Sequence, residues 1–132
     1  MPVNGPPVVK PRPVYLNLVR IRLPLPGFVS ILHRVSGAAL FLVGIPLLLF
    51  AVQTSLESAD AYADLKAIFA HPLCKLVVVG LLWAYLHHFF AGIRFLLLDL
   101  HVGDDLKPAR QSSVVVLAAS LAMTLIIAVR LW

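Results

Sequence analysis

Charged residues are scarce in this sequence. Asp, Glu, Lys and Arg together make up 13% of the 132 residues, whereas 61% of the residues are hydrophobic. A typical soluble domain has about 25% charged and roughly 45–50% apolar residues. The chain therefore carries more apolar surface than one small core can bury, which excludes an ordinary soluble enzyme and a disordered tail.

Cysteine is nearly absent as well. Cys74 is the single cysteine, so the chain cannot form an internal disulfide. It has neither a CxxC zinc-ligand pair nor a CxxCH motif for covalent haem attachment. The net charge of +5 does not indicate a nucleic acid partner, because the basic residues do not gather on one soluble face. Their distribution along the chain is typical of membrane topology.

Long runs without any charge dominate what remains. They cover residues 35–56, 76–93 and 111–129. As helices they would each be roughly 27–33 Å long, close to the thickness of the hydrocarbon layer. The runs predict an all-α membrane protein with three transmembrane helices, near residues 29–52, 73–98 and 112–131. Pro46 lies inside the first of these and predicts a kink there.

The segment before the first helix is rich in proline. Seven of the ten prolines lie within residues 1–28, where they prevent a continuous helix. The segment also lacks the apolar core of a signal peptide, so we expect it to be retained. We predict an extended N-terminal arm over residues 1–28 and a membrane anchor domain over residues 29–132.

The positions of Lys and Arg predict the orientation in the membrane. Eight of the 11 lie in the arm, at the start of the first helix or between the second and third helices. The positive-inside rule then places the N-terminus in the cytoplasm and the C-terminus on the opposite side. Because the arm is not a Ser- and Arg-rich amphipathic transit peptide, we expect a bacterial inner membrane and a periplasmic C-terminus.

A first polar cluster opens the first helix. Ser30, His33, Arg34 and Gly37 are spaced so that they share one helix face. Arg34 alone could snorkel to the headgroups from its place near the helix end. A hydroxyl, an imidazole and a guanidinium together favour a small-molecule site, because they can donate hydrogen bonds to a carbonyl or carboxylate.

A second polar cluster lies near the middle of the second helix. His88 shares a face with Gly80, Ala84 and Gly92, at intervals of four residues. Two interpretations are open. The small residues either allow close helix packing with His88 bonded across the interface, or form a groove for a flat macrocycle with His88 as axial ligand. His87 points about 100° away, so only one of the two histidines faces the groove.

The number of suitably placed histidines limits how many haem ligands this chain can supply. A six-coordinate haem needs two ligands on opposite faces at one depth. The third helix has no histidine, and His33 is predicted to lie a turn or more shallower than His88. We therefore expect this chain to supply one ligand and a partner the other. Arg94, near the cytoplasmic end of the second helix, snorkels, pairs loosely with Asp99 or holds an acidic group such as a propionate.

Two motifs carry a resemblance that covers almost the whole chain. The first comprises Arg12-Pro13-Val-Tyr-Leu-Asn-Leu, Ile21-Arg22-Leu-Pro24 and Ser30-Ile-Leu-His33-Arg34-Val-Ser-Gly37, and the second is His88-Phe-Phe-Ala-Gly92-Ile-Arg94-Phe-Leu-Leu-Leu-Asp99. In this order they resemble the cytochrome b556 subunits of succinate dehydrogenase. The sequence departs from that pattern at Phe95, where the family often has a second histidine.

The resemblance implies a membrane anchor subunit of respiratory complex II. Such a subunit pairs with a second three-helix anchor subunit, and both hold a flavoprotein subunit and an iron–sulfur subunit at the cytoplasmic side. His88 would be the axial ligand of haem b, and Ser30 and Arg34 would lie at the ubiquinone site. His33 and Arg34 would lie near the haem propionates, with Arg94 as a further candidate. The Arg-Pro segment of the arm would dock against the iron–sulfur subunit.

These expectations define an electron-transfer function. Electrons from succinate would reach ubiquinone at the cytoplasmic edge of the anchor, with no organic catalysis by this chain alone. It would take part in an enzyme only as a subunit of succinate dehydrogenase. One alternative is a quinol:fumarate reductase anchor, which would run the reaction in reverse. Another is a haem-free structural anchor in which His88 serves helix packing.

Overall fold

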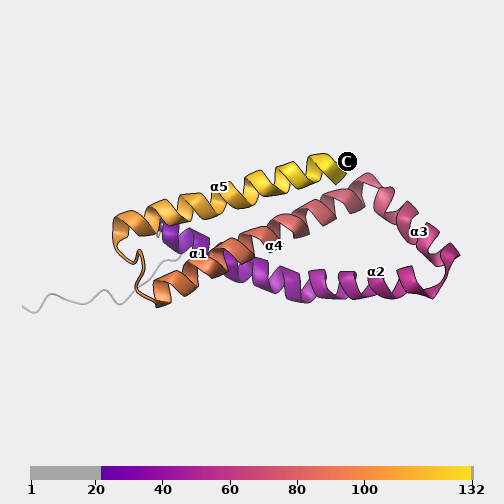
Figure 1. The fold of residues 1–132 in the computed structure, drawn as a ribbon, viewed down its shortest axis with the longest axis horizontal. Helices are drawn as coiled ribbons and strands as arrows, with labels where there is room; N and C mark the ends of the chain where they lie inside the picture. Colours follow the sequence, from indigo (N-terminus) through magenta and orange to yellow (C-terminus); the bar gives the residue numbers. More distant parts are fainter. Residues whose placement is uncertain (1–21, 132) are drawn as a thin grey trace, which may run out of the picture.

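The computed structural model describes residues 22–131, which form helices joined by short connections and include no strand (Figure 1). Along the chain the elements are α1 (Leu25–Ala39), the short π-helix η1 (Leu40–Gly44), α2 (Ile45–Glu57), α3 (Ala59–Ala70), α4 (Pro72–Asp99) and α5 (Leu106–Leu131). The predicted arm lies outside the described residues up to residue 21, and so does its Arg-Pro segment.

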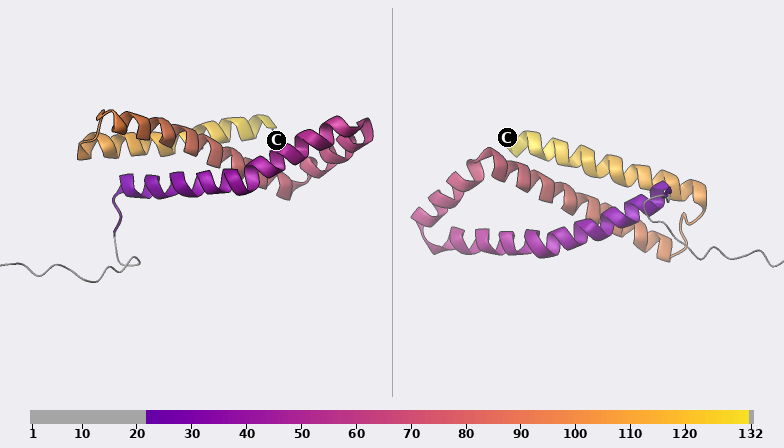
Figure 2. Two further views of the ribbon diagram at one scale, coloured as in Figure 1. Left: turned by 90° about the horizontal axis from the view of Figure 1, so that it is seen from below. Right: turned by 180° about the vertical axis from the view of Figure 1, so that it is seen from behind.

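Three of the helical stretches are long and apolar enough to cross a membrane. They are α1 to α2 as one continuous stretch over Leu25–Glu57, then α4, then α5. This confirms the predicted three-helix membrane protein. The chain runs along the molecule, returns through α4 and runs out again through α5, so its described ends lie at opposite ends (Figures 1 and 2). Large apolar side chains such as Phe41 and Leu48 are exposed on its outside, as a lipid-facing surface requires.

The first helix begins at Leu25 instead of residue 29. Pro24 precedes it in an extended conformation, and Pro26 lies in its first turn. A proline is tolerated there because the first N–H groups of a helix have no partner within it. Residues 25–28, which the proline count assigns to the arm, therefore form the opening turn of α1.

The predicted distortion at Pro46 takes the form of a π-turn. The chain widens over η1, immediately before the proline, and the N–H of Ile45 donates to the carbonyl of Leu40. Pro46 has no N–H to offer to the preceding turn, and a single wider turn accommodates that loss within a continuing helix. The first span thus stays continuous through to Glu57 instead of ending at residue 52.

A helix that the sequence analysis did not predict connects the first two spans. Ser58 begins α3 as its N-cap, and its Oγ accepts a hydrogen bond from the N–H of Ala61 at 3.0 Å. Asp60 in the first turn complements the positive end of the helix. His71 then caps α4, its Nδ1 accepting from the N–H of Leu73 at 3.3 Å. In Figure 1, α3 forms a bridge at the far end of the molecule from the start of α1.

The core lies where α1, α4 and α5 pack against one another. Val29, Ala91 and Val116 form its buried apolar cluster, one from each helix. The buried hydroxyls of α5, on Ser113, Ser120 and Thr124, donate to carbonyls of their own helix. Since these groups are satisfied within α5, the helix can bury a small polar face without leaving a donor unpaired. This packed end of the bundle carries all of the predicted site residues.

Candidate functional site

His88 projects from α4 onto α1, where the two helices cross. Its Nδ1 lies 3.0 Å from the backbone carbonyl oxygen of His33 and 3.3 Å from Oγ of Ser36. Ser36 Oγ donates to the same carbonyl at 2.9 Å. Because a carbonyl oxygen only accepts, Nδ1 carries the hydrogen, and in the neutral imidazole Nε2 then holds the lone pair. Nε2 has no hydrogen-bond partner within residues 22–131 and is the nitrogen that remains for a ligand.

Gly37 makes this position of His88 possible. A Cβ added to Gly37 would lie 2.8 Å from Cε1 of His88 and 3.2 Å from its Nδ1. Real Cβ atoms essentially never show a contact as short as 2.8 Å, so any other residue at position 37 would require the ring to shift. The sequence analysis placed Gly37 on the polar face of the first helix, and the structure gives it this specific role.

His33 stacks on His88. The ring centroids are 4.1 Å apart and the rings are inclined by 10°, so the expectation that His33 lies a turn or more shallower is wrong. The early start of α1 places His33 roughly two turns inside the helix. Two stacked rings cannot approach one metal ion from opposite sides. The prediction that a partner supplies the second ligand therefore stays, and it now rests on this stacking. Phe95 lies against His33, at 5.1 Å between centroids.

The predicted polar face of α1 divides into two parts. His33 and Gly37 contact α4, whereas Ser30 is half-buried and Arg34 is exposed. Within the described part of the chain, no hydrogen bond is formed by the Ser30 hydroxyl or the Arg34 guanidinium. Both groups lie close in sequence to His33, on the same helix.

The predicted groove on α4 is interrupted. At Gly80 the surface is open, with no atom within 4 Å of an added Cβ. Ala84 is buried, and an added Cβ on Gly92 would lie 3.7 Å from Nε2 of His33. Near Gly92 the small side chain thus lets α1 approach α4 closely. Near Gly80 the face of α4 is uncovered.

His87 lies on a different face of α4 and is fully buried. It stacks on Trp83, with ring centroids 5.3 Å apart. The backbone of Val29 lies nearby, but neither ring nitrogen reaches hydrogen-bond geometry with any described residue. An enclosed ring leaves no room for a macrocycle beside it, so the geometry favours His88 over His87 as a ligand.

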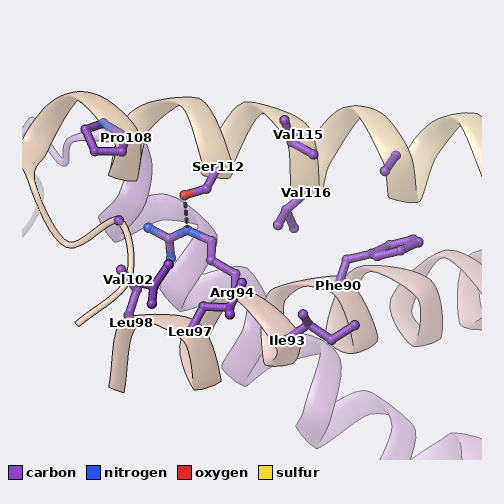
Figure 3. A pocket seen from close by; sticks show the side chains of 12 residues that line it. Phe90, Ile93, Arg94, Leu97, Leu98, Val102, Pro108, Ser112, Val115 and Val116 are labelled. Atoms are coloured by element: carbon purple, nitrogen blue, oxygen red, sulfur yellow. Dashed lines mark hydrogen bonds between the residues drawn. The ribbon is translucent and has the colours of Figure 1, made fainter. Parts of the chain in front are cut away.

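Arg94 faces α5 and is not brought together with the two stacked histidines. Its Nε donates to Oγ of Ser112 at 2.9 Å (Figure 3). Its Nη2 donates to the carbonyl of Ala109 at 3.3 Å. The guanidinium also lies 5.4 Å from the centre of the Phe95 ring. Its predicted role at a propionate stays a prediction.

Two functional residues escaped the sequence analysis. Ser36, 3% exposed, fixes the carbonyl that orients His88, and Ser112 holds Arg94. The available signal was weak. Ser36 lies three residues after His33, at a spacing that shares a helix face, and Ser112 is one of several hydroxyl residues in the third span. Among the described residues, no three His, Cys, Asp or Glu side chains gather around a common point where a bare metal ion could bind.

Comparisons with known proteins agree with one another. The family model described as succinate dehydrogenase/fumarate reductase transmembrane subunit matches residues 9–127. The chain is 34% identical over 122 residues to the succinate dehydrogenase cytochrome b556 subunit of Coxiella burnetii, covering 92% of this chain and 97% of the relative. It is 30% identical over 115 residues to the protein of that name from Paracoccus denitrificans, covering 87% and 88%.

Proposed function

Because the chain belongs to the family of succinate dehydrogenase/fumarate reductase transmembrane subunits, we propose that it anchors a succinate:quinone oxidoreductase, binds haem b and helps to form the quinone site. The observation that carries this proposal is the hydrogen bond from His88 Nδ1 to the His33 carbonyl, which leaves Nε2 free. Histidines that bind metals commonly donate their other ring N–H to a carbonyl in this way.

The donor set fits a haem better than a bare metal ion. A porphyrin supplies four of the ligands of its iron, so the protein needs to offer only axial ones, and His88 is suited to be one of them. The second axial ligand would come from a second three-helix anchor subunit. When bound, haem b supplies a one-electron carrier whose potential depends on its axial ligands and burial. His33 and Arg34 are the candidates for holding its propionates, and Arg94 would first have to leave Ser112.

Ser30 and Arg34 are proposed to bind the quinone. Both donors lie in the first turns of α1, beside His33, and have no partner among the described residues. They would donate hydrogen bonds to the quinone carbonyl oxygens. As electrons arrive, negative charge develops on these oxygens, and the two donors then bind them more strongly than before.

The remaining parts of the proposal concern the assembly. The partners would be the second anchor subunit, an iron–sulfur subunit and a flavoprotein subunit at the cytoplasmic face of a bacterial inner membrane. The exposed apolar side chains of the three spans provide surface for the second anchor and for lipid. The family also includes fumarate reductase subunits, whose direction of electron flow depends on cofactor potentials and not on this fold.

Replacing Arg34 tests the quinone site. We expect Arg34→Leu in the whole complex to lower succinate:ubiquinone reductase kcat about 100-fold, as the loss of one charge-stabilising donor does. Succinate oxidation with a soluble dye as acceptor should stay unchanged. Arg110→Leu, another exposed arginine that lies on α5, serves as the control. Equal losses with quinone and with dye would contradict a role for Arg34 at the quinone.

Replacing Ser36 tests how His88 is held. In Ser36→Ala the His33 carbonyl no longer accepts from Ser36 Oγ, so the hydrogen bond from His88 Nδ1 strengthens and the ligand becomes more basic. We expect haem to be retained and its midpoint potential to fall; about 1 kcal/mol in the hydrogen bond corresponds to roughly 40 mV for one electron. Redox titration measures it, with Ser120→Ala as the buried control. An unchanged potential would contradict the role given to Ser36.

A further inference from the structure

A groove of about 380 Å³ lies between the end of α4 and the start of α5 (Figure 3). Apart from Arg94 and Ser112, its walls are almost entirely apolar. The side chains that form the long wall include Phe90, Ile93, Leu97, Val115 and Val116. It lies on the side of α4 that faces α5, and neither His33 nor His88 lines it.

Arg94 gives the groove a positive charge without a negative partner. The side chain is only 5% exposed, and the groups that it donates to, Ser112 Oγ and the Ala109 carbonyl, are both neutral. Among the described residues no carboxylate pairs with it. Asp104, in the exposed loop, contacts His101 Nδ1 at 3.3 Å and not Arg94. A buried cation without an anion is costly, so the groove lacks one negative charge.

The positive charge lies at one end of the groove, and the apolar wall continues beyond it along the spans. In Figure 3 the guanidinium points towards Pro108 and Val102, near the loop between the helices, whereas Phe90 and Val116 lie further along the spans. Arg94 precedes the end of α4 at Asp99 by about 8 Å of helix. An occupant must therefore carry an anion near the end of the helices and an apolar chain that continues towards the membrane interior.

We propose that this groove binds an acidic phospholipid, with its phosphate at Arg94 and an acyl chain along the α4–α5 wall. A free anion would leave the apolar wall uncovered, and an uncharged lipid would leave Arg94 without its counterion. Pockets between transmembrane helices that combine a basic residue with apolar walls recognise acidic lipids for these reasons. The inference does not depend on haem or quinone binding.

The test uses the whole complex in detergent and counts bound lipids by native mass spectrometry. Dioleoyl phosphatidylglycerol and dioleoyl phosphatidylcholine have the same acyl chains and differ in net charge. We expect the wild type to bind one phosphatidylglycerol at least tenfold more tightly than phosphatidylcholine. Arg94→Gln should abolish that preference, and Arg130→Gln, which changes an exposed arginine near the other end of α5, should keep it.

A second variant leaves Arg94 in place. Ala119→Trp fills the apolar end of the groove and should weaken binding of phosphatidylglycerol at least tenfold while the haem spectrum stays unchanged. Equal affinity of the wild type for the two lipids would overturn the proposal, as would wild-type binding in both variants. Displacement of the lipid by inorganic phosphate alone would also overturn it, because a free anion would then suffice.

Discussion

Replacing His88 by alanine is expected to abolish the low-spin b-type spectrum of the complex, whereas replacing His87 should leave that spectrum intact. The Nδ1 of His88 is occupied by its hydrogen bond to the His33 carbonyl, so Nε2 is the ring nitrogen left to bind iron. Without the ring the iron loses an axial ligand and becomes high-spin, or the haem is lost. The measurement is a dithionite-reduced minus oxidised absorption spectrum of purified wild-type and variant complexes.

His87→Leu is the matched control, because His87 lies next to His88 on the same helix and at nearly the same depth. His87 is fully buried with both ring nitrogens unpartnered among the described residues. An apolar side chain of similar size removes that unsatisfied group, so stability should stay equal or rise. Loss of the spectrum only in His87→Leu would move the ligand by one residue. A wild-type complex without a haem band would favour a haem-free structural anchor.

The spans of this protein could be predicted from the sequence because the membrane imposes a simple constraint. A helix must remain apolar for about 20 residues to cross the bilayer, and the three uncharged runs satisfy that requirement. The connecting helix α3 was missed because it is short and lies outside such a run. Its start depends on one local hydrogen bond, from the Ala61 N–H to Ser58. The start of α1 at Leu25, with Pro26 in its first turn, likewise depends on local conformation at a helix end.

Sequence alone could identify only those site residues whose polar side chains are costly to place inside a membrane span. His88 stands out because an imidazole in the middle of a span is rare, and Arg34 stands out for its charge. The contacts that hold the site depend on how two helices cross, which no spacing along one helix encodes. The stacking of His33 on His88 and the pairing of Arg94 with Ser112 join different spans. Ser36 acquires its role only because α4 brings His88 to the carbonyl of His33.

Gly37→Ala should therefore disturb the haem almost as much as removing the ligand does. The added methyl carbon would lie 2.8 Å from Cε1 of His88, so the ring must shift, and the shift disturbs its hydrogen bond to the His33 carbonyl. Losing such an orienting contact typically costs roughly 10–100-fold in metal affinity. We expect haem content to fall by at least tenfold at limiting haem, or the remaining haem to become high-spin in the same difference spectrum.

The control for Gly37→Ala is Gly27→Ala in the same helix. There an added Cβ would meet only Leu23 and Pro24 side chains, at 3.7 Å or more, which is ordinary van der Waals contact. Both substitutions raise helix propensity equally, so a general effect on α1 would appear in both variants. A normal low-spin spectrum in Gly37→Ala would contradict the seating of His88 on Gly37. A loss confined to position 37 would tie the haem to the α1–α4 crossing, because only there does a methyl group meet the imidazole.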